Sequence, residues 1–189
     1  MSNEIMNKSV KYFLLAFLFS WLSFRSNAQD TSAGFADLVP FVTTPWEVIE
    51  AMLDMAKITK DDYIIDLGSG DGRIPISAAK KFGAKGLGIE IDKDLVSDAF
   101  DLAKKEGVDH LVDFKQGDLF ELDFSKATVL TLYLFPDINL KLRPKIWGMP
   151  SGTRVISHRF DMGDWEPTET RTIELADGKR HTVFLWIVN

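Results

Sequence analysis

The stretch YIIDLGSGDGR, residues 63–73, constrains the fold of this chain more than any other part of the sequence. It begins with an apolar run and continues into three glycines at alternate positions, Gly68, Gly70 and Gly72. The apolar run predicts a buried strand, and the glycines allow the backbone to turn sharply and to approach a ligand closely. A strand, a glycine-rich turn and a helix in this order are typical of nucleotide-binding sites in α/β proteins.

Strand and helix patterns alternate along the rest of the sequence. The spacing of apolar residues predicts helices over residues 46–57, 73–82, 95–107 and 138–149. Short apolar runs predict strands over residues 63–68, 87–91, 112–115, 127–135, 153–160, 170–175 and 181–188. The Asp177-Gly178 pair between the last two strands is a hairpin signal. We therefore expect an α/β fold with a doubly wound, mostly parallel sheet, helices on both faces and an antiparallel C-terminal hairpin.

Several of these boundaries depend on single residues. Thr44 is a favourable N-cap for the first helix, and Pro45 suits the first helical position. The nearly continuous apolar run over residues 127–135 predicts a central strand buried on both faces, which Pro136 ends. Pro144 predicts a kink or a break in the helix that follows.

The N-terminal part of the sequence has the layout of a targeting segment. Residues 12–24 are 13 residues without a charge, preceded by Lys8 and Lys11. Ser26-Asn27-Ala28 follows with the small-x-small pattern of a cleavage site. The run is shorter than the roughly 20 residues that span a membrane, so we predict a secretory signal peptide over residues 1–28. An uncleaved anchor, with membrane association through the same run, is the alternative.

The rest of the chain divides into a linker and one domain. Residues 29–39 are polar and small, which predicts a linker. Residues 40–189 are enough to enclose a compact core. The N-terminal layout leads us to expect an exported, periplasmic protein or a membrane-anchored one.

The composition excludes several classes of function. The net charge is -6, and the sequence has no dense cluster of Lys and Arg, which argues against a nucleic-acid partner. The absence of cysteine excludes disulfides, thiolate nucleophiles and Cys-ligated metals. His110, His158 and His181 are scattered, and no pair has a metal-ligand spacing, so no metal site is predicted.

Charge around the glycine turn distinguishes between two classes of ligand. Dinucleotide sites use G-x-G-x-x-G, but here Arg73 stands at the position of the third glycine. A pyrophosphate would also have to approach Asp66 and Asp71, and like charges in a partly buried site repel strongly. S-adenosylmethionine carries a sulfonium and an ammonium group and no phosphate. The acidic turn therefore favours S-adenosylmethionine as the cofactor and makes a nicotinamide-dependent enzyme the least favoured reading.

Two further carboxylates follow the next strands. Glu90 ends the second predicted strand, about 20 residues past the turn, where an acid that binds ribose hydroxyls is expected. Asp118, in Gly117-Asp118-Leu119 after the third strand, offers a carboxylate to an adenine amino group. Either acid alone is more often a solvated surface group, and Asp66 alone is more often a turn cap. All three together, after consecutive strands, are far more specific.

These motifs resemble those of the class I S-adenosylmethionine-dependent methyltransferases, whose fold is Rossmann-like. The resemblance rests on DLGSGDGR, GIEID and QGDLF. The segments PFVTTP, TLYLFPDINLKLRPKI and RVISHRFDMGDWEP further resemble the small lysine N-methyltransferase family that acts on the ATP synthase c-subunit and the adenine nucleotide translocase, with its bacterial relatives. The resemblance covers roughly residues 40–189.

The resemblance implies roles for individual residues. It places Thr43 and Thr44 near the methionine end of the cofactor, and Leu134-Phe135-Pro136 beside the methyl group. Many amino methyltransferases carry an Asn-Pro-Pro-type motif there, and this chain lacks that Asn. The cofactor-binding residues predicted from the turn, the acids and the resemblance together are Thr43, Thr44, Asp66, Gly68, Ser69, Gly70, Asp71, Glu90, Ile91, Asp118 and Leu119.

The predicted catalytic residues are Tyr133, Phe135, Pro136 and Asp137. A lysine nucleophile must lose a proton before it attacks the methyl group, and Tyr133 and Asp137 are placed to orient it or to accept that proton. In the alternative reading, Tyr133 packs in the core and Asp137 is a helix N-cap.

The expected activity is methyl transfer to an accessible lysine of a protein partner. A small-molecule acceptor and a cofactor-binding module without transferase activity are the alternatives. An exported enzyme conflicts with the cytosolic supply of the cofactor. The sequence makes no prediction of the oligomeric state.

Overall fold

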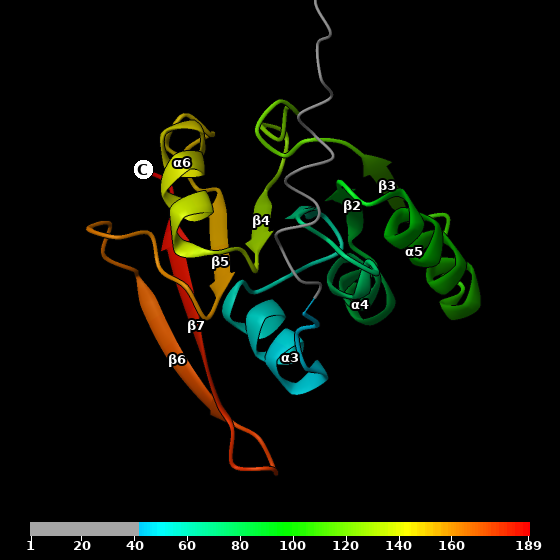
Figure 1. The fold of residues 1–189 in the computed structure, drawn as a ribbon, viewed down its shortest axis with the longest axis horizontal. Coiled ribbons are helices and arrows are strands. Elements are labelled where there is room, and N and C mark those ends of the chain that lie inside the picture. Colours follow the sequence, from blue (N-terminus) through cyan, green and yellow to red (C-terminus); the bar gives the residue numbers. More distant parts are fainter. Residues whose placement is uncertain (1–41) are drawn as a thin grey trace, which may run out of the picture. The chain divides into compact units, whose positions relative to one another are not determined.

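The computed structural model of the chain describes residues 42–189 (Figure 1). The predictions made for residues 1–28 and 29–39, namely the signal peptide or anchor and the linker, lie outside these residues. Within residues 42–189, no helix has both the length and the apolar character that crossing a membrane requires.

The described residues alternate between helices and strands, as predicted. The helices are α3 (Trp46–Met55), α4 (Arg73–Phe82), α5 (Lys93–Glu106) and α6 (Pro136–Trp147). The strands are β1 (Tyr63–Leu67), β2 (Lys85–Glu90), β3 (Val112–Gln116), β4 (Val129–Leu132), β5 (Arg154–His158), β6 (Glu169–Glu174) and β7 (Arg180–Ile187).

All of these strands join one sheet, in the order β3-β2-β1-β4-β5-β7-β6. The five strands from β1 to β5 are parallel, whereas β7 pairs antiparallel with both β5 and β6. This confirms the predicted α/β fold with a mostly parallel sheet and an antiparallel C-terminal hairpin. Because β7 lies between β5 and β6, residues far apart in the sequence become neighbours at this end of the sheet.

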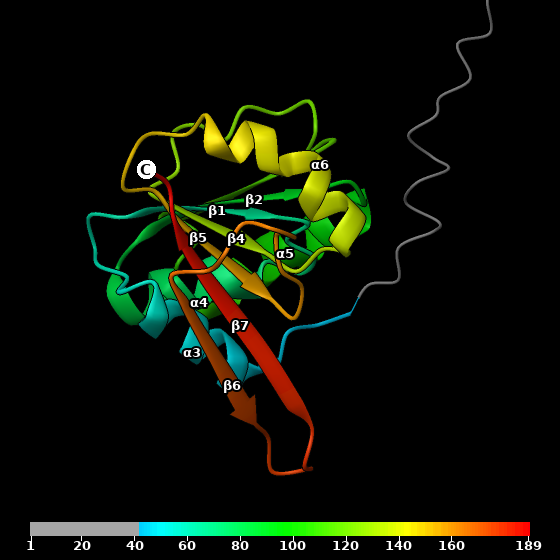
Figure 2. The ribbon, with the colours of Figure 1, turned by 90° about the vertical axis from the view of Figure 1, so that its left-hand side faces the viewer.

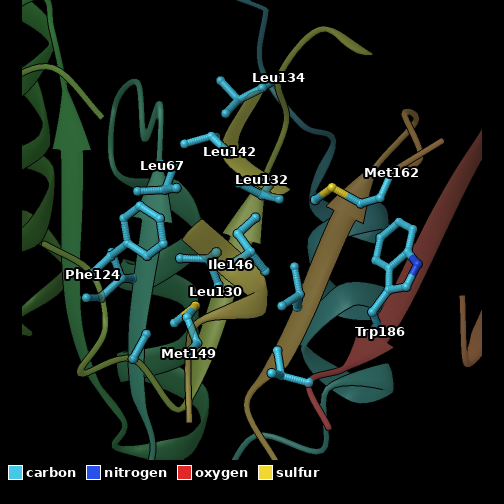
Figure 3. Close-up of a cluster of buried hydrophobic side chains, with 14 of the residues drawn as sticks. Leu67, Phe124, Leu130, Leu132, Leu134, Leu142, Ile146, Met149, Met162 and Trp186 are labelled. Atoms are coloured by element: carbon cyan, nitrogen blue, oxygen red, sulfur yellow. The ribbon is translucent and has the colours of Figure 1, made fainter. Parts of the chain in front are cut away.

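Helices cover both faces of the sheet (Figure 2). Side chains alternate along each strand, so Ile64 of β1 packs in the cluster beneath α3 and α4, and Ile65 packs in the cluster beneath α6. Figure 3 shows the cluster beneath α6, in which Leu130 and Leu132 of β4 lie beside Ile146. All four residues of β4 are buried, as predicted for a central strand.

Several predicted boundaries were wrong by a few residues. β4 spans Val129–Leu132 instead of residues 127–135, because the chain leaves the sheet at Tyr133 and turns into α6. Pro136 is the first residue of α6, where its missing N–H has no helical partner to lose. Pro144 lies inside α6 without ending it.

The prediction that Thr44 caps the first helix was also wrong. The N-cap position is held by Pro45, and no side chain caps the helix there. The hydroxyl of Thr44 is instead within hydrogen-bond distance of His158, at the carboxyl end of β5.

Candidate functional site

The carboxyl ends of β1 to β5 meet at one edge of the sheet because these strands are parallel. The predicted cofactor-binding and catalytic residues lie in the last residues of these strands, in the loops that follow them and in the first turn of α6, except Thr43 and Thr44, which precede α3. The fold therefore brings together, at one edge, acids and glycines that are up to about 50 residues apart in the sequence.

The loop after β1 is a tight turn that depends on its glycines. The N–H groups of Gly68 and Ser69 both donate to the Ile89 carbonyl of β2, at 2.9 and 3.0 Å. Gly68 and Gly72 have φ of +72° and +76°, which side-chain-bearing residues rarely adopt. A Cβ on Gly68 would also lie 2.8 Å from Leu134 Cδ2. The turn thus lies against the loop after β4, where the predicted catalytic residues lie.

Asp66 is buried just before this turn. Its Oδ1 accepts a hydrogen bond from Thr131 Oγ1 at 2.5 Å, and the residue is only 2 % exposed. Burial raises the pKa of Asp66 to about 7, the Thr131 hydrogen bond opposes this shift, and the charges of Glu90 and Asp71 add to it. A carboxylate held at this energetic disadvantage is typical of a functional site and favours a cationic ligand.

Asp71 has a different environment. Its carboxylate accepts hydrogen bonds from Arg73 Nε at 2.9 Å and from Arg73 Nη2 at 2.6 Å. Arg73 Nη1 also donates to the Thr44 carbonyl at 3.2 Å, which ties the segment before α3 to the turn. Because Arg73 neutralises Asp71, the charge argument against a pyrophosphate rests on Asp66 and Glu90 and no longer on Asp71.

Glu90 connects the loop after β2 to the glycine turn. Its Oε2 accepts from the Gly70 N–H at 2.8 Å, and its Oε1 accepts from the N–H groups of Ile91 and Asp92 at 2.8 and 3.1 Å. These three backbone donors fix the orientation of the carboxylate. Since an ionised carboxylate offers about four acceptor positions, roughly one is left for a ligand hydroxyl.

Asp118 and Leu119 lie beside Glu90. The Gly117 N–H donates to the Glu90 carbonyl at 2.9 Å, so the loops after β2 and β3 are adjacent. Asp118 Oδ1 accepts from the Phe120 N–H at 2.8 Å, which folds the loop back on itself. Leu119 is half-buried and packs against the cluster beneath α6.

These groups fit S-adenosylmethionine. Carboxylates and backbone amides suit hydroxyl, amino and cationic groups, and Ser69 Oγ is buried without a hydrogen-bond partner among residues 42–189. In this arrangement Glu90 would hold the ribose hydroxyls, Asp118 the adenine amino group, and Asp66 would lie toward the ammonium group. The three assignments stay predictions of the sequence and geometry.

The predicted catalytic residues occupy the loop after β4 and the first turn of α6. The Tyr133 ring lies 4.0 Å from the His158 ring, centroid to centroid, and is half-buried. Phe135 is 39 % exposed, and its ring lies 6.0 Å from that of Phe160. Asp137 is exposed in the first helical turn and is not the N-cap, a position that Phe135 holds. These residues line the outer part of the site.

The sequence analysis missed a buried pair of histidines. His158 Nδ1 lies 3.1 Å from Thr44 Oγ1, and His158 Nε2 lies 2.8 Å from His181 Nδ1. His158 is fully buried, and burial, with smaller contributions from His181 and Arg159, lowers its pKa to about 3. The predicted strands over residues 153–160 and 181–188 each contain one of these histidines, but only the pairing of the strands shows that the two rings meet. No group of three metal-ligating side chains occurs within residues 42–189.

Comparison with known proteins agrees with this site. The model of the ANTKMT methyltransferase domain matches residues 66–169. A protein-lysine N-methyltransferase of Saccharolobus islandicus is 42% identical over 153 residues, which cover 79% of this chain and 94% of that protein. This chain belongs to the ANTKMT methyltransferase family. It is an S-adenosylmethionine-dependent methyltransferase, as the acidic glycine turn predicted.

A human relative and a crystal structure are also similar to this chain, over different shares of their own length. The human lysine N-methyltransferase of the ATP synthase c-subunit is 34% identical over 130 residues, or 68% of this chain and 55% of that protein, so the chain spans a little over half of its length. A crystal structure described as an RNA methyltransferase from Salinibacter ruber, in complex with S-adenosyl-L-homocysteine, has 53% identity and a TM-score of 0.72. The match covers 78% of this chain and 94% of the chain in that crystal structure.

Proposed function

We propose that this family member transfers methyl groups to lysine side chains of a protein substrate. The observation that carries the proposal is the charge of the edge where β1 to β5 end. Acidic groups predominate over basic ones there. The acids in or just after the ends of these strands are Asp66, Asp71, Glu90, Asp92, Asp118, Asp137 and Asp161, and the basic groups are Arg73, Lys93, Lys115 and Arg159.

An acidic edge suits a positively charged substrate. The ion pair between Arg73 and Asp71 removes one charge of each sign, so the excess of acids at this edge is unchanged by it. A lysine ammonium would be attracted to it, whereas the phosphates of a nucleic acid would be repelled. The net charge of -6 for the whole chain acts in the same direction.

The chain has to orient the two reactants and keep water away. When bound, S-adenosylmethionine supplies an activated methyl group, so no residue needs to form a covalent intermediate. Leu134 packs on Gly68 between the turn and the loop after β4, and it is 7 % exposed. Tyr133 and Phe135 continue this side of the site outward to its exposed edge. A side chain of a protein substrate can reach that edge.

The names of the relatives indicate two different kinds of macromolecular substrate. The Saccharolobus and human relatives are named lysine methyltransferases, while the Salinibacter structure is described as an RNA methyltransferase. We favour lysine because the acidic edge opposes RNA phosphates. An RNA or a small-molecule acceptor is therefore an outcome of the test below.

The test uses the full chain with labelled S-adenosylmethionine and three acceptors: poly-L-lysine, poly-L-arginine and an in vitro RNA transcript. We expect label in poly-L-lysine alone, with Nε-methyl-lysine found by mass spectrometry after hydrolysis. Calorimetry with S-adenosylmethionine, and with NADH as a control, shows separately that the cofactor binds. Label in the RNA and none in poly-L-lysine would overturn the proposal. Binding without label in any of the three would point to a small-molecule acceptor or a protein without transferase activity.

A further inference from the structure

Three polar side chains form a continuous series of hydrogen-bond contacts from the cofactor side of the molecule to β7. Thr44 Oγ1 lies 3.1 Å from His158 Nδ1, and His158 Nε2 lies 2.8 Å from His181 Nδ1. Thr44 and His158 are buried, while His181 is partly exposed. This series of contacts thus has an inner end at Thr44 and an outer end at His181, which reaches solvent.

The inner end lies between two parts of the site. The Thr44 carbonyl accepts from Arg73, which binds Asp71 of the glycine turn. The His158 ring lies against the ring of Tyr133, in the loop that follows β4. Thr44 and His158 therefore connect the cofactor-binding turn to the loop predicted to hold the substrate amine.

Methylation of a lysine requires that one proton leave for every methyl group transferred. At neutral pH the free side chain is an ammonium, and only the neutral amine has a lone pair for attack. One N–H bond must break before the N–CH₃ bond forms and the S–CH₃ bond breaks. If the site is closed to bulk water, the proton needs a path through the protein.

We propose that Thr44, His158 and His181 are a proton relay that carries this proton from the substrate ammonium to solvent. The inference rests on the proposed lysine methylation. Thr44 Oγ1 takes the proton from the ammonium while its own hydrogen moves to His158 Nδ1. The hydrogen on His158 Nε2 moves to His181 Nδ1, and His181 releases a proton from Nε2 to water. Each group ends with as many protons as it began with, and the amine has lost one.

The arrangement of hydrogens allows this movement. A single hydrogen occupies each of the two short contacts, so one imidazole nitrogen of His158 is a donor while the other is an acceptor. The groups that face His158 are the Tyr133 ring, His181 and the Arg159 guanidinium. Burial and the positive charge of Arg159 oppose a resting charge on His158, and its pKa is about 3, so a proton that reaches it is passed on.

The experiment compares His181→Gln with His110→Gln in the full chain, using poly-L-lysine as the acceptor. His181 lies on β7, away from the cofactor turn, and glutamine can hydrogen-bond there but has no second ring nitrogen to pass a proton. His110 is exposed in the loop before β3 and serves as the matched control. Thr44→Val and His158→Phe interrupt the same relay at its other two members.

For His181→Gln at pH 7.5 we expect kcat to fall about 100-fold, within the range that general acid–base groups contribute. KM for S-adenosylmethionine and the calorimetric Kd for S-adenosylhomocysteine should stay within about two-fold of wild type. The deficit should shrink to under about ten-fold near pH 10, where poly-L-lysine loses its protons unaided. His110→Gln should match wild type throughout.

Three results would overturn the relay. The first is a kcat deficit that is equal at pH 7.5 and pH 10, because a merely structural role has no reason to follow the ionisation of the substrate. The second is imidazole ¹⁵N NMR of the wild type in which His158 gains a proton with an ordinary pKa near 6.5, since such a group would trap the proton. The third is unchanged kcat in all three relay variants.

The relay and the proposed function fail in different ways. If wild type methylates poly-L-lysine and the relay variants do so equally well, lysine methylation stands and the relay is wrong. If wild type binds S-adenosylhomocysteine but methylates only the RNA transcript, both are wrong, because the relay serves an ammonium.

Discussion

Glu90 Oε2 accepts a hydrogen bond from the Gly70 N–H at 2.8 Å, so the acid after β2 holds the glycine turn after β1 in place. Glu90 therefore has a structural role in addition to the predicted contact with ribose. Glu90→Gln keeps the size of the side chain but replaces a charged acceptor of three N–H groups. We expect affinity for S-adenosylhomocysteine to fall about 10- to 100-fold in calorimetry, as hydrogen bonds to charged groups contribute about 1.5–3 kcal/mol.

The matched control is Asp98→Asn, which removes the same unit of charge from an exposed position on α5. Its affinity should equal that of the wild type. Equal losses in the two variants would show that net charge, and not the Glu90 carboxylate, governs binding.

Asp66 and Asp62 should respond to pH in different ways. Asp66 has a pKa raised to about 7 by burial, so between about pH 4 and pH 7 the unfolded chain releases this proton before the folded protein does, and stability falls as the pH rises. Asp66→Asn lacks this loss. Relative to wild type, its free energy of unfolding in urea should therefore be about 3 kcal/mol more favourable at pH 8.5 than at pH 5, while it binds the cofactor more weakly.

Asp62 is the counterpart at the other end of β1. Burial raises its pKa, but hydrogen bonds from Thr128 and Thr59 and the contact with Arg154 outweigh burial and leave the pKa lowered. Asp62 is thus ionised in both the folded and the unfolded state between pH 5 and 8.5. Asp62→Asn should destabilise by about 2–3 kcal/mol at both pH values, because it leaves Arg154 without its ion-pair partner. A similar pH trend in the two variants would contradict both assignments.

Gly72→Ala and Gly107→Ala separate backbone strain from crowding. The φ angles of the two glycines are +76° and +73°, so an alanine has a similar conformational cost of about 1–2 kcal/mol at either position. A Cβ on Gly72 would clash with the Phe114 ring, whereas nothing lies within 4 Å of one on Gly107. Gly72→Ala should therefore be the more destabilising by a further 1–3 kcal/mol or so, measured by urea unfolding. Equal effects would mean that Phe114 moves aside without penalty.

The N-terminal prediction is testable by mass spectrometry. We propose that residues 1–28 are removed on export, so the mature protein isolated from a bacterial periplasm should begin at Gln29. The intact mass of the full chain in the membrane fraction would instead support the anchor. Full-length protein confined to the cytosol would contradict export and remove the conflict with cofactor supply.

The sequence predicts best where the determinants are local. The places of the glycine turn, Glu90 and Asp118 at the ends of consecutive strands were predicted because each follows a short apolar run at a recognisable spacing. Thr44 was misassigned because an N-cap preference is weak, and a tertiary contact with His158 replaced it. The histidine pair was missed because β5 and β7 meet only through their antiparallel register, in which His158 lies opposite Val183. A local pattern carries no information on that register.

The position of β7 has a consequence for how the enzyme is completed during synthesis. β5 is translated more than 20 residues before β7, yet β7 supplies its second hydrogen-bonding neighbour and carries His181. Until the ribosome has released β7, the nascent sheet ends at β5 in an unpaired edge, which is a point of aggregation and a binding site for chaperones. The cofactor-binding turn can form early, but the proposed relay is complete only after β7 has paired with β5. With the relay proposed above, quality control is therefore expected to act on chains that can already bind the cofactor but still lack His181 at the outer end of the relay.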